Sequence, residues 1–182
     1  MVPRYEQLVK INRSGLVLEG VLGAPPNAIG VVVFAHGSGS GRFSPRNGYV
    51  AKVLQERGIA TLLLDLLTEH EAEDRAYVFA IELLADRLLH AKHWLHSKED
   101  TASLALAYFG ASTGAGAALV AAAREPEDIF AVVSRGGRPD LASGYLRSVT
   151  VPTLLIVGGD DEGVIDLNYE ALKALQIGRA HV

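Results

Sequence analysis

Short apolar runs alternate with amphipathic segments along most of the chain, and this alternation limits the available folds more than any other feature. A short apolar run is typical of a buried strand, whereas apolar residues spaced by three and four mark one face of a helix. Alternating strands and helices build a mostly parallel sheet with helices on both faces. We therefore expect strands at residues 30–35, 59–64, 104–109, 129–134 and 152–157, and helices at 46–57, 77–95, 115–124 and 166–176.

The remaining segments complete a single domain. A hairpin is expected at the start, with strands at residues 8–12 and 16–22 joined by a turn at Ser14-Gly15. Residues 67–74 are polar and are expected to form a loop that could cover a site as a short lid. No repeat or linker divides the sequence, so residues 1–182 are expected to form one three-layer α/β domain.

Composition excludes several classes of protein. The chain has 182 residues, no cysteine and a formal net charge of −4. The absence of cysteine excludes disulfides, thiolate nucleophiles and cysteine-bound metals, and the charge argues against a basic nucleic-acid-binding surface. The first fifteen residues lack the apolar stretch of a signal peptide, and no run reaches membrane-spanning length. We expect a cytoplasmic protein with a small-molecule substrate and neither nucleic-acid nor membrane partners.

Gly110-Ala111-Ser112-Thr113-Gly114 fits the pattern G-x-S-x-G and lies between an expected strand and an expected helix. A sharp turn there would strain the backbone of its central residue, and the flanking glycines would let the chain pass close to itself. Such a turn lifts the Ser112 hydroxyl above the sheet edge, at the positive end of the helix. Ser112 is therefore the candidate nucleophile; the alternative is a small-residue turn with no catalytic role.

A carbonyl that is attacked by a serine develops negative charge on its oxygen and needs hydrogen-bond donors. The segment His-Gly-Ser-Gly-Ser-Gly at residues 36–41 directly follows an expected strand. In a site of this kind that loop supplies one backbone N–H, and the residue after the nucleophile supplies the other. The candidate donors are Thr113 and, from the loop, Ser38 and then Gly37. No Gly-Lys-Ser/Thr follows the loop and no dinucleotide fingerprint is complete, which disfavours nucleotide binding.

Two carboxylates follow the last expected strand, because Gly158-Gly159 leads from it to Asp160 and Asp161. A carboxylate in this position can orient the histidine that serves as base for a serine nucleophile. The alternative is that both side chains only cap the next turn.

Four segments of the sequence resemble dienelactone hydrolase-type proteins of the α/β-hydrolase superfamily: residues 35–47, 108–123, 132–141 and 152–168. The resemblance extends from about residue 6 to residue 176. It implies an α/β-hydrolase fold, a triad in the order Ser, Asp, His, and hydrolysis of an ester, thioester or lactone through an acyl-enzyme. The G-G-x-D spacing of this group favours Asp161 over Asp160. Dienelactone hydrolases proper carry a cysteine where this chain has Ser112, so lactone specificity does not transfer.

In the resembled family a further strand, the catalytic histidine and a final helix would follow the helix at residues 166–176. The chain instead closes with Ile-Gly-Arg-Ala-His-Val at 177–182, which matches a translated sequencing adapter, so the natural protein is expected to continue. His181 is the only histidine after Asp161 and is the candidate base, although the few residues before it barely span the return from the helix. The strand at 152–157 would then be an exposed edge, which invites either pairing with another chain, as in a homodimer, or aggregation.

Four arginines lie in loops that follow expected strands: Arg42, Arg46, Arg135 and Arg138. They are candidates for binding a carboxylate or phosphate of the substrate, and the alternative is that they pair with Asp140 or Glu125. His36 lies on the same side and either borders the substrate or shapes the oxyanion loop.

The row His90, His93 and His96 along one expected helix favours a solvated face over a metal site, and neither a metal nor a cofactor is expected. Two hypotheses follow for the function. The first is an acyl hydrolase, and the second is a catalytically silent relative that binds a small anionic ligand or a protein partner.

Overall fold

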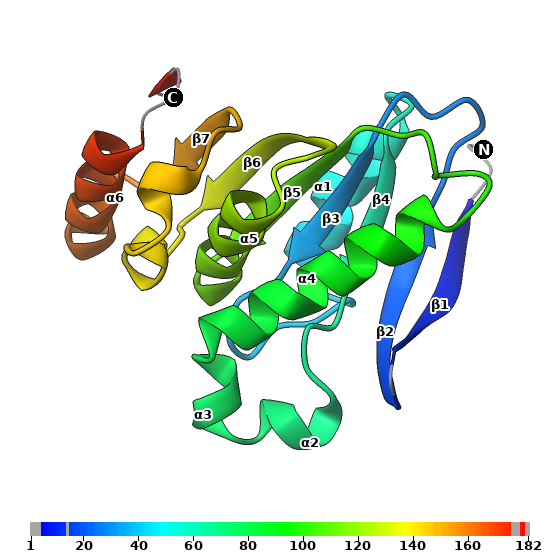
Figure 1. Ribbon diagram of the computed structural model, residues 1–182, viewed down its shortest axis with the longest axis horizontal. Helices are drawn as coiled ribbons and strands as arrows, with labels where there is room; N and C mark the ends of the chain where they lie inside the picture. The colour runs from blue at the N-terminus through cyan, green and yellow to red at the C-terminus, as the bar shows by residue number, and fades with distance from the viewer. Residues whose placement is uncertain (1–4, 14, 176–178, 181–182) are drawn as a thin grey trace.

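The computed structural model describes residues 5–13, 15–175 and 179–180, which form one mixed sheet flanked by helices (Figure 1). The strands are β1 (Glu6–Arg13), β2 (Leu16–Gly23), β3 (Val31–Ala35), β4 (Ala60–Leu64), β5 (Leu106–Ala111), β6 (Ile129–Arg135), β7 (Thr153–Ile156) and β8 (Arg179–Ala180). Their order across the sheet is β1-β2-β4-β3-β5-β6-β7-β8. β2 is antiparallel to β1 and β4, and every other neighbouring pair is parallel. The predicted fold class, a mostly parallel α/β sheet, is confirmed.

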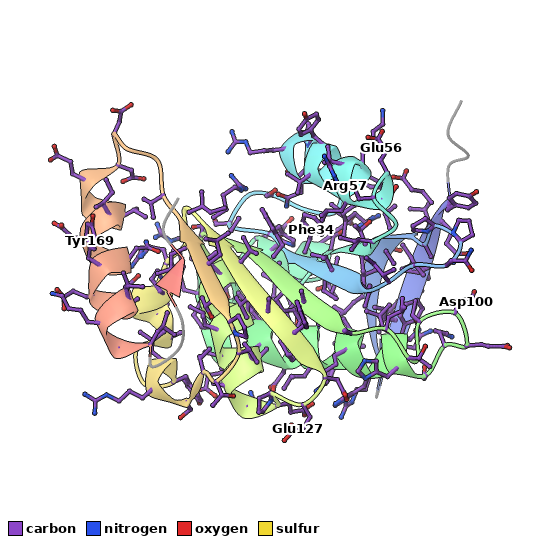
Figure 2. All side chains as sticks on the ribbon, turned by 90° about the horizontal axis from the view of Figure 1, so that it is seen from above. Phe34, Glu56, Arg57, Asp100, Glu127 and Tyr169 are labelled. Atoms are coloured by element: carbon purple, nitrogen blue, oxygen red, sulfur yellow. The ribbon has the colours of Figure 1, made fainter. Side chains whose placement is uncertain are left out.

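Helices cover both faces of this sheet. They are α1 (Pro45–Gln55), α2 (Glu69–Ala72), α3 (Arg75–Val78), α4 (Ile81–His96), α5 (Thr113–Arg124) and α6 (Glu162–Ala174), with short 3-10 turns η1 (Pro139–Ala142) and η2 (Leu146–Ser148). α1 lies on one face and α4 with α5 on the other, as both views show (Figures 1 and 2). α2 and α3 lie below the sheet in Figure 1, between β4 and α4 in the chain.

The central strands are buried on both faces, which explains their continuous apolar runs. All five residues of β4 are buried. On the α1 face, Phe34 packs with Ala51 and Leu63, and Figure 2 shows Phe34 between the sheet and α1. On the opposite face α5 is rich in buried alanine, which lets this helix lie close to the sheet. The core therefore fixes the carboxyl ends of β3 and β5 next to each other.

The segment between β4 and α4 differs from the prediction. Residues 67–74 contain a helical turn, α2, where a loop was expected. The turn forms because Thr68 and Glu71 make a capping box, in which each side chain bonds the backbone N–H of the other residue. The helix that was expected from residue 77 begins at Ile81, and Tyr77 belongs instead to α3, which Asp74 caps.

Two boundaries near the last strands also differ. α6 begins at Glu162 rather than at residue 166, because Asp161 caps it. β7 was expected to be an open edge, but Thr153 and Leu154 pair in parallel with the two residues of β8. Part of the expected edge is therefore paired within the chain.

Candidate active site

Ser112 occupies the sharp turn between β5 and α5, with φ of 49° and ψ of −123°. A residue with a side chain rarely takes a positive φ, so surrounding contacts must hold it there. A Cβ on Gly110 would lie 2.4 Å from the Cα of Ala115, and one on Gly114 would lie 2.2 Å from the carbonyl oxygen of Ala35. Both glycines are therefore required for the turn and for the close approach of α5 to β3. The structure has the strand–turn–helix geometry that the sequence predicted around Ser112.

The loop after β3 lies directly against Ser112, since a Cβ on Gly37 would lie 2.8 Å from the Cβ of Ser112. His36 fixes this loop through both ring nitrogens. Its Nδ1 lies 2.9 Å from the carbonyl oxygen of Gly37, and its Nε2 lies 3.2 Å from the backbone nitrogen of Leu66. Because the Leu66 N–H donates to Nε2, the ring proton lies on Nδ1 and is donated to Gly37. Both nitrogens of His36 are thus occupied in shaping the loop.

The predicted oxyanion donors are the backbone N–H groups of Ser38, in the loop that contacts Ser112 through Gly37, and of Thr113, the residue after Ser112. The Gly37 carbonyl accepts a second hydrogen bond, from the Ser40 N–H at 3.2 Å. Because a trans peptide places its C=O and N–H on opposite sides, the Ser38 N–H points away from His36. Thr113 is the first residue of α5, where helix N–H groups have no internal partner. Within the described residues neither the Ser38 nor the Thr113 N–H has a backbone acceptor.

Ser112 borders a cavity of about 580 Å³. Its wall consists of the loop after β3, the start of α1, the turn at Ser112 and the end of β6: Gly37, Ser40, Ser44, Pro45, Arg46, Asn47, Ala111, Ser112, Arg135 and Gly136. Arg46 and Arg135 are the charged residues in this wall. Burial, and then the nearby Arg46 guanidinium, lower the pKa of Arg135 below its usual range. The structure therefore places a cationic cavity in front of the candidate nucleophile.

A second, smaller pocket of about 220 Å³ is lined in part by the loop after β3. Five of its lining residues are apolar: Leu66, Leu67, Ala72, Val78 and Leu84. Thr113 and the loop residues 36–40 complete the wall. Gly37 and Ser40 line both cavities, so the two cavities meet at this loop.

The other two candidate arginines pair with carboxylates inside the protein. Arg42 binds Asp65 through its side chain and its backbone N–H, and its Nη2 lies 2.7 Å from Glu19. Arg138 donates to Asp140 from Nε at 2.8 Å and from Nη2 at 2.7 Å. The hydrogen bond from Arg138 is the largest cause that lowers the pKa of Asp140. The alternative that the sequence left open, pairing with Asp140, is thus the arrangement found for Arg138.

Asp161 follows β7 and caps α6, where its Oδ1 accepts a hydrogen bond from the Val164 N–H at 3.4 Å. Both Asp160 and Asp161 are exposed. In the part of the chain that the structure describes, neither carboxylate contacts a histidine. The candidate base His181 lies outside the described residues.

In the histidine row on α4, His93 faces other charged groups. His93 Nε2 lies 2.8 Å from Glu125 Oε2, and the Lys92 ammonium lies 3.5 Å from the same oxygen. Among the residues placed by the structure, no three His, Cys, Asp or Glu side chains are grouped as metal ligands.

No helix within the described residues is long and apolar enough to cross a membrane.

Sequence reasoning missed three polar residues of the larger cavity: Ser40, Ser44 and Asn47. One signal was available, because a serine before a proline is typical of a helix start. Ser44 caps α1 and accepts from the Asn47 N–H at 3.4 Å, which fixes the start of the helix at the cavity. Nothing in the sequence indicated that Asn47 would be 3% exposed.

Comparison with solved structures finds a strong similarity to a dienelactone hydrolase from Anabaena variabilis. The two chains are 55% identical with a TM-score of 0.93, and the match covers 97% of this chain and 83% of that one. Est1E from Butyrivibrio proteoclasticus is 16% identical with a TM-score of 0.81, over 96% of this chain and 88% of that chain. A predicted CIB-like hydrolase from Thermoplasma acidophilum is 15% identical with a TM-score of 0.77, over 98% and 86%. The last two share the fold.

Comparison with curated proteins finds two from Mycobacterium tuberculosis that carry the provisional name phosphoribosyl transferase. Each is 57% identical over 169 residues, which is 93% of this chain. The chain spans 38% of the length of these relatives. No family model matches the chain.

Proposed function

The chain belongs to the dienelactone hydrolase-like family of α/β-hydrolases, and from this premise we propose that it is a serine hydrolase acting on an ester, thioester or lactone. The observation that carries the proposal is the strained turn at Ser112, together with the Thr113 and Ser38 N–H groups, which have no backbone acceptor among the described residues. The phosphoribosyl transfer named for the curated relatives is not part of this proposal, because the chain spans only 38% of them.

In the proposed reaction the Ser112 hydroxyl oxygen attacks the carbonyl carbon while a base removes its proton. The carbonyl oxygen becomes an oxyanion, and the N–H groups of Thr113 and Ser38 bind it. The bond to the leaving group then breaks, and the departing alcohol or thiol takes the proton from the base. A water molecule, deprotonated by the same base, attacks the acyl-enzyme and releases the acid and free Ser112.

The proposed base is a histidine that Asp161 orients. His36 precedes Gly37, which contacts Ser112, but both of its ring nitrogens are occupied, by the Gly37 carbonyl and the Leu66 N–H. His181 is the one histidine of the sequence that follows Asp161, which matches the expected order of the triad.

The second candidate function is a catalytically silent protein that binds a small anionic ligand or a protein partner. One observation favours it: no histidine of the described residues forms a hydrogen bond with Ser112 or Asp161. The two functions differ in a single measurable property, which is turnover at Ser112.

Hydrolysis of p-nitrophenyl acetate and labelling by a fluorophosphonate distinguish them. We expect both to occur in the unmodified chain, and Ser112→Ala to abolish labelling and reduce the rate about a thousandfold or more. Ser148→Ala, at an exposed serine that lines neither cavity, is the matched control and should label normally. Asp161→Asn should lower kcat/KM more than Asp160→Asn if Asp161 is the acid. Absence of labelling in the folded, unmodified chain would reject the hydrolase and favour the binding protein.

A further inference from the structure

The cavity in front of Ser112 is cationic although the chain as a whole has a net charge of −4. Arg46 and Arg135 are its only charged lining residues. Over the described ranges, neither guanidinium lies within 4.0 Å of a carboxylate. The nearby Arg42 and Arg138, by contrast, each form an ion pair inside the protein. The two cavity arginines are thus left without an internal counter-charge.

Arg135 is also poorly supplied with acceptors. Its Nη2 lies 3.5 Å from Oδ1 of the buried Asn47, and its Nε is buried with no hydrogen-bond partner among the described residues. A buried donor without an acceptor is unfavourable, and so are two like charges that face one cavity. Both costs are relieved when an anion binds between the guanidiniums.

We propose that this cavity binds a phosphate group of the substrate, so that Ser112 cleaves the ester of a phosphorylated alcohol. This inference rests on the proposed hydrolase function. A phosphomonoester carries a charge of about −1.5 to −2 at pH 7 and three terminal oxygens. It can therefore engage two guanidiniums that come from separate elements, α1 and the end of β6. The hydroxyls of Ser40 and Ser44 in the same wall supply further donors.

A carboxylate matches the cavity less well. It has one charge and two oxygens, which suffice for one bidentate arginine but leave the second guanidinium without a counter-charge. Phosphate is therefore the anion that uses both Arg46 and Arg135.

The apolar pocket indicates the other half of the substrate. It holds about 220 Å³, is lined by leucine, valine and alanine side chains, and contacts the oxyanion loop. A short apolar acyl group fits this space, whereas the phosphorylated alcohol occupies the larger cavity. Arg46 is exposed at that cavity, so the alcohol can leave towards solvent after the ester bond breaks.

Anion binding tests the arginine pair independently of turnover. Isothermal titration calorimetry would measure the affinity for inorganic phosphate and for acetate at equal ionic strength, with the unmodified chain and with Ser112→Ala. We expect phosphate to bind about tenfold more tightly than acetate, and Arg46→Gln and Arg135→Gln each to weaken phosphate about tenfold. Arg147→Gln, at an exposed arginine outside both cavities, should leave the affinity unchanged. Because Arg46 is exposed, Arg46→Gln stays informative even if Arg135→Gln does not fold.

Equal affinities for phosphate and acetate, or equal effects of the Arg46 and Arg147 substitutions, would overturn the phosphate site. If phosphate binds as expected but the fluorophosphonate does not label Ser112, the hydrolase proposal fails while the anion site stands, as a binding site only. The two failures are therefore distinguishable.

Turnover tests the substrate class. The acetate ester of ethylene glycol monophosphate should be cleaved with a kcat/KM about tenfold or more above that of ethylene glycol monoacetate. Arg46→Gln should remove this preference. Equal rates for the two esters would overturn the phosphate requirement, and faster cleavage of decanoyl than of acetyl p-nitrophenyl esters would overturn the short acyl group.

Discussion

Around Ser112 the backbones of β3, β5 and α5 meet at contact distance, whereas around Asp161 the chain is open to solvent. Added Cβ atoms on Gly37, Gly110 and Gly114 would lie between 2.2 and 2.8 Å from their nearest neighbours. Gly158 and Gly159, which lead to Asp161, have nothing within 4 Å of such an atom.

This difference separates two ways of holding a candidate catalytic group. Around Ser112 the position is set by main-chain packing, so residues larger than glycine are poorly tolerated at Gly37, Gly110 and Gly114. The exposed Asp161 carboxylate is held by one capping hydrogen bond, which it accepts from the Val164 N–H at 3.4 Å. The candidate nucleophile is thus preorganised by the fold, while the candidate acid depends on local contacts.

A matched pair of glycine substitutions tests this contrast most strongly. In Gly114→Ala the new Cβ would lie 2.2 Å from the carbonyl oxygen of Ala35 and 2.5 Å from that of His36, and neither backbone atom can move easily. We expect a loss of about 3 kcal/mol in the free energy of unfolding. Gly159→Ala meets open space and should change it by less than about 0.5 kcal/mol. Urea denaturation measures both, and similar losses would contradict the contrast.

The loop between β4 and α4 is a third case, held by charged side chains rather than by backbone contact. Glu71 accepts from the Thr68 N–H at 2.9 Å and from Arg87 Nη2 at 2.8 Å, and the Arg87 side chain is only 7% exposed. Glu71→Gln leaves this guanidinium without a counter-charge, so we expect a loss of about 2 kcal/mol. Glu69→Gln, at an exposed position of the same helix, is the control and should be nearly neutral. Equal effects in urea denaturation would show that the ion pair does not hold the loop.

The same pair predicts a pH dependence. Burial alone would raise the pKa of Glu71, but the hydrogen bonds from Thr68 and the charge of Arg87 outweigh it, so the pKa lies below its usual value of 4.5. A lowered folded-state pKa stabilises the protein above the unfolded-state pKa, and this contribution is lost as the pH falls through the folded-state value. The stability difference between the unmodified chain and Glu71→Gln should therefore shrink below about pH 4.5. A difference that is constant down to strongly acidic pH would contradict the assignment.

The same contrast explains what the sequence could predict. The turn at Ser112 was predictable because its causes, two glycines and a flanking strand and helix, lie within a few residues of it. The loop at 67–74 was misjudged although one cause of its helical turn is local, because Thr68 and Glu71 have the spacing of a capping box. The second cause, the contact of Glu71 with Arg87 sixteen residues away in the chain, leaves no mark within the segment itself.

The arginines show a similar limit. All four lie after strands, so sequence alone ranked them together. Their separation into internal pairs and cavity residues depends on where Glu19, Asp65 and Asp140 lie in space. Parallel strand order brings distant loops to one edge, but it does not say which carboxylate each cation meets.

The smallest predicted effect concerns Asp161, where the cap and the proposed acid can be separated. Asp161→Ala removes the acceptor for the Val164 N–H, and because that bond is long and exposed we expect a loss of about 0.5 kcal/mol. Asn caps helices about as well as Asp, so Asp161→Asn should retain the stability of the unmodified chain. Any fall in hydrolysis in Asp161→Asn then reports the missing charge rather than a displaced helix. Should Asp161→Asn unfold as easily as Asp161→Ala, the carboxylate charge itself would hold the start of α6, and its loss of activity would no longer identify the acid.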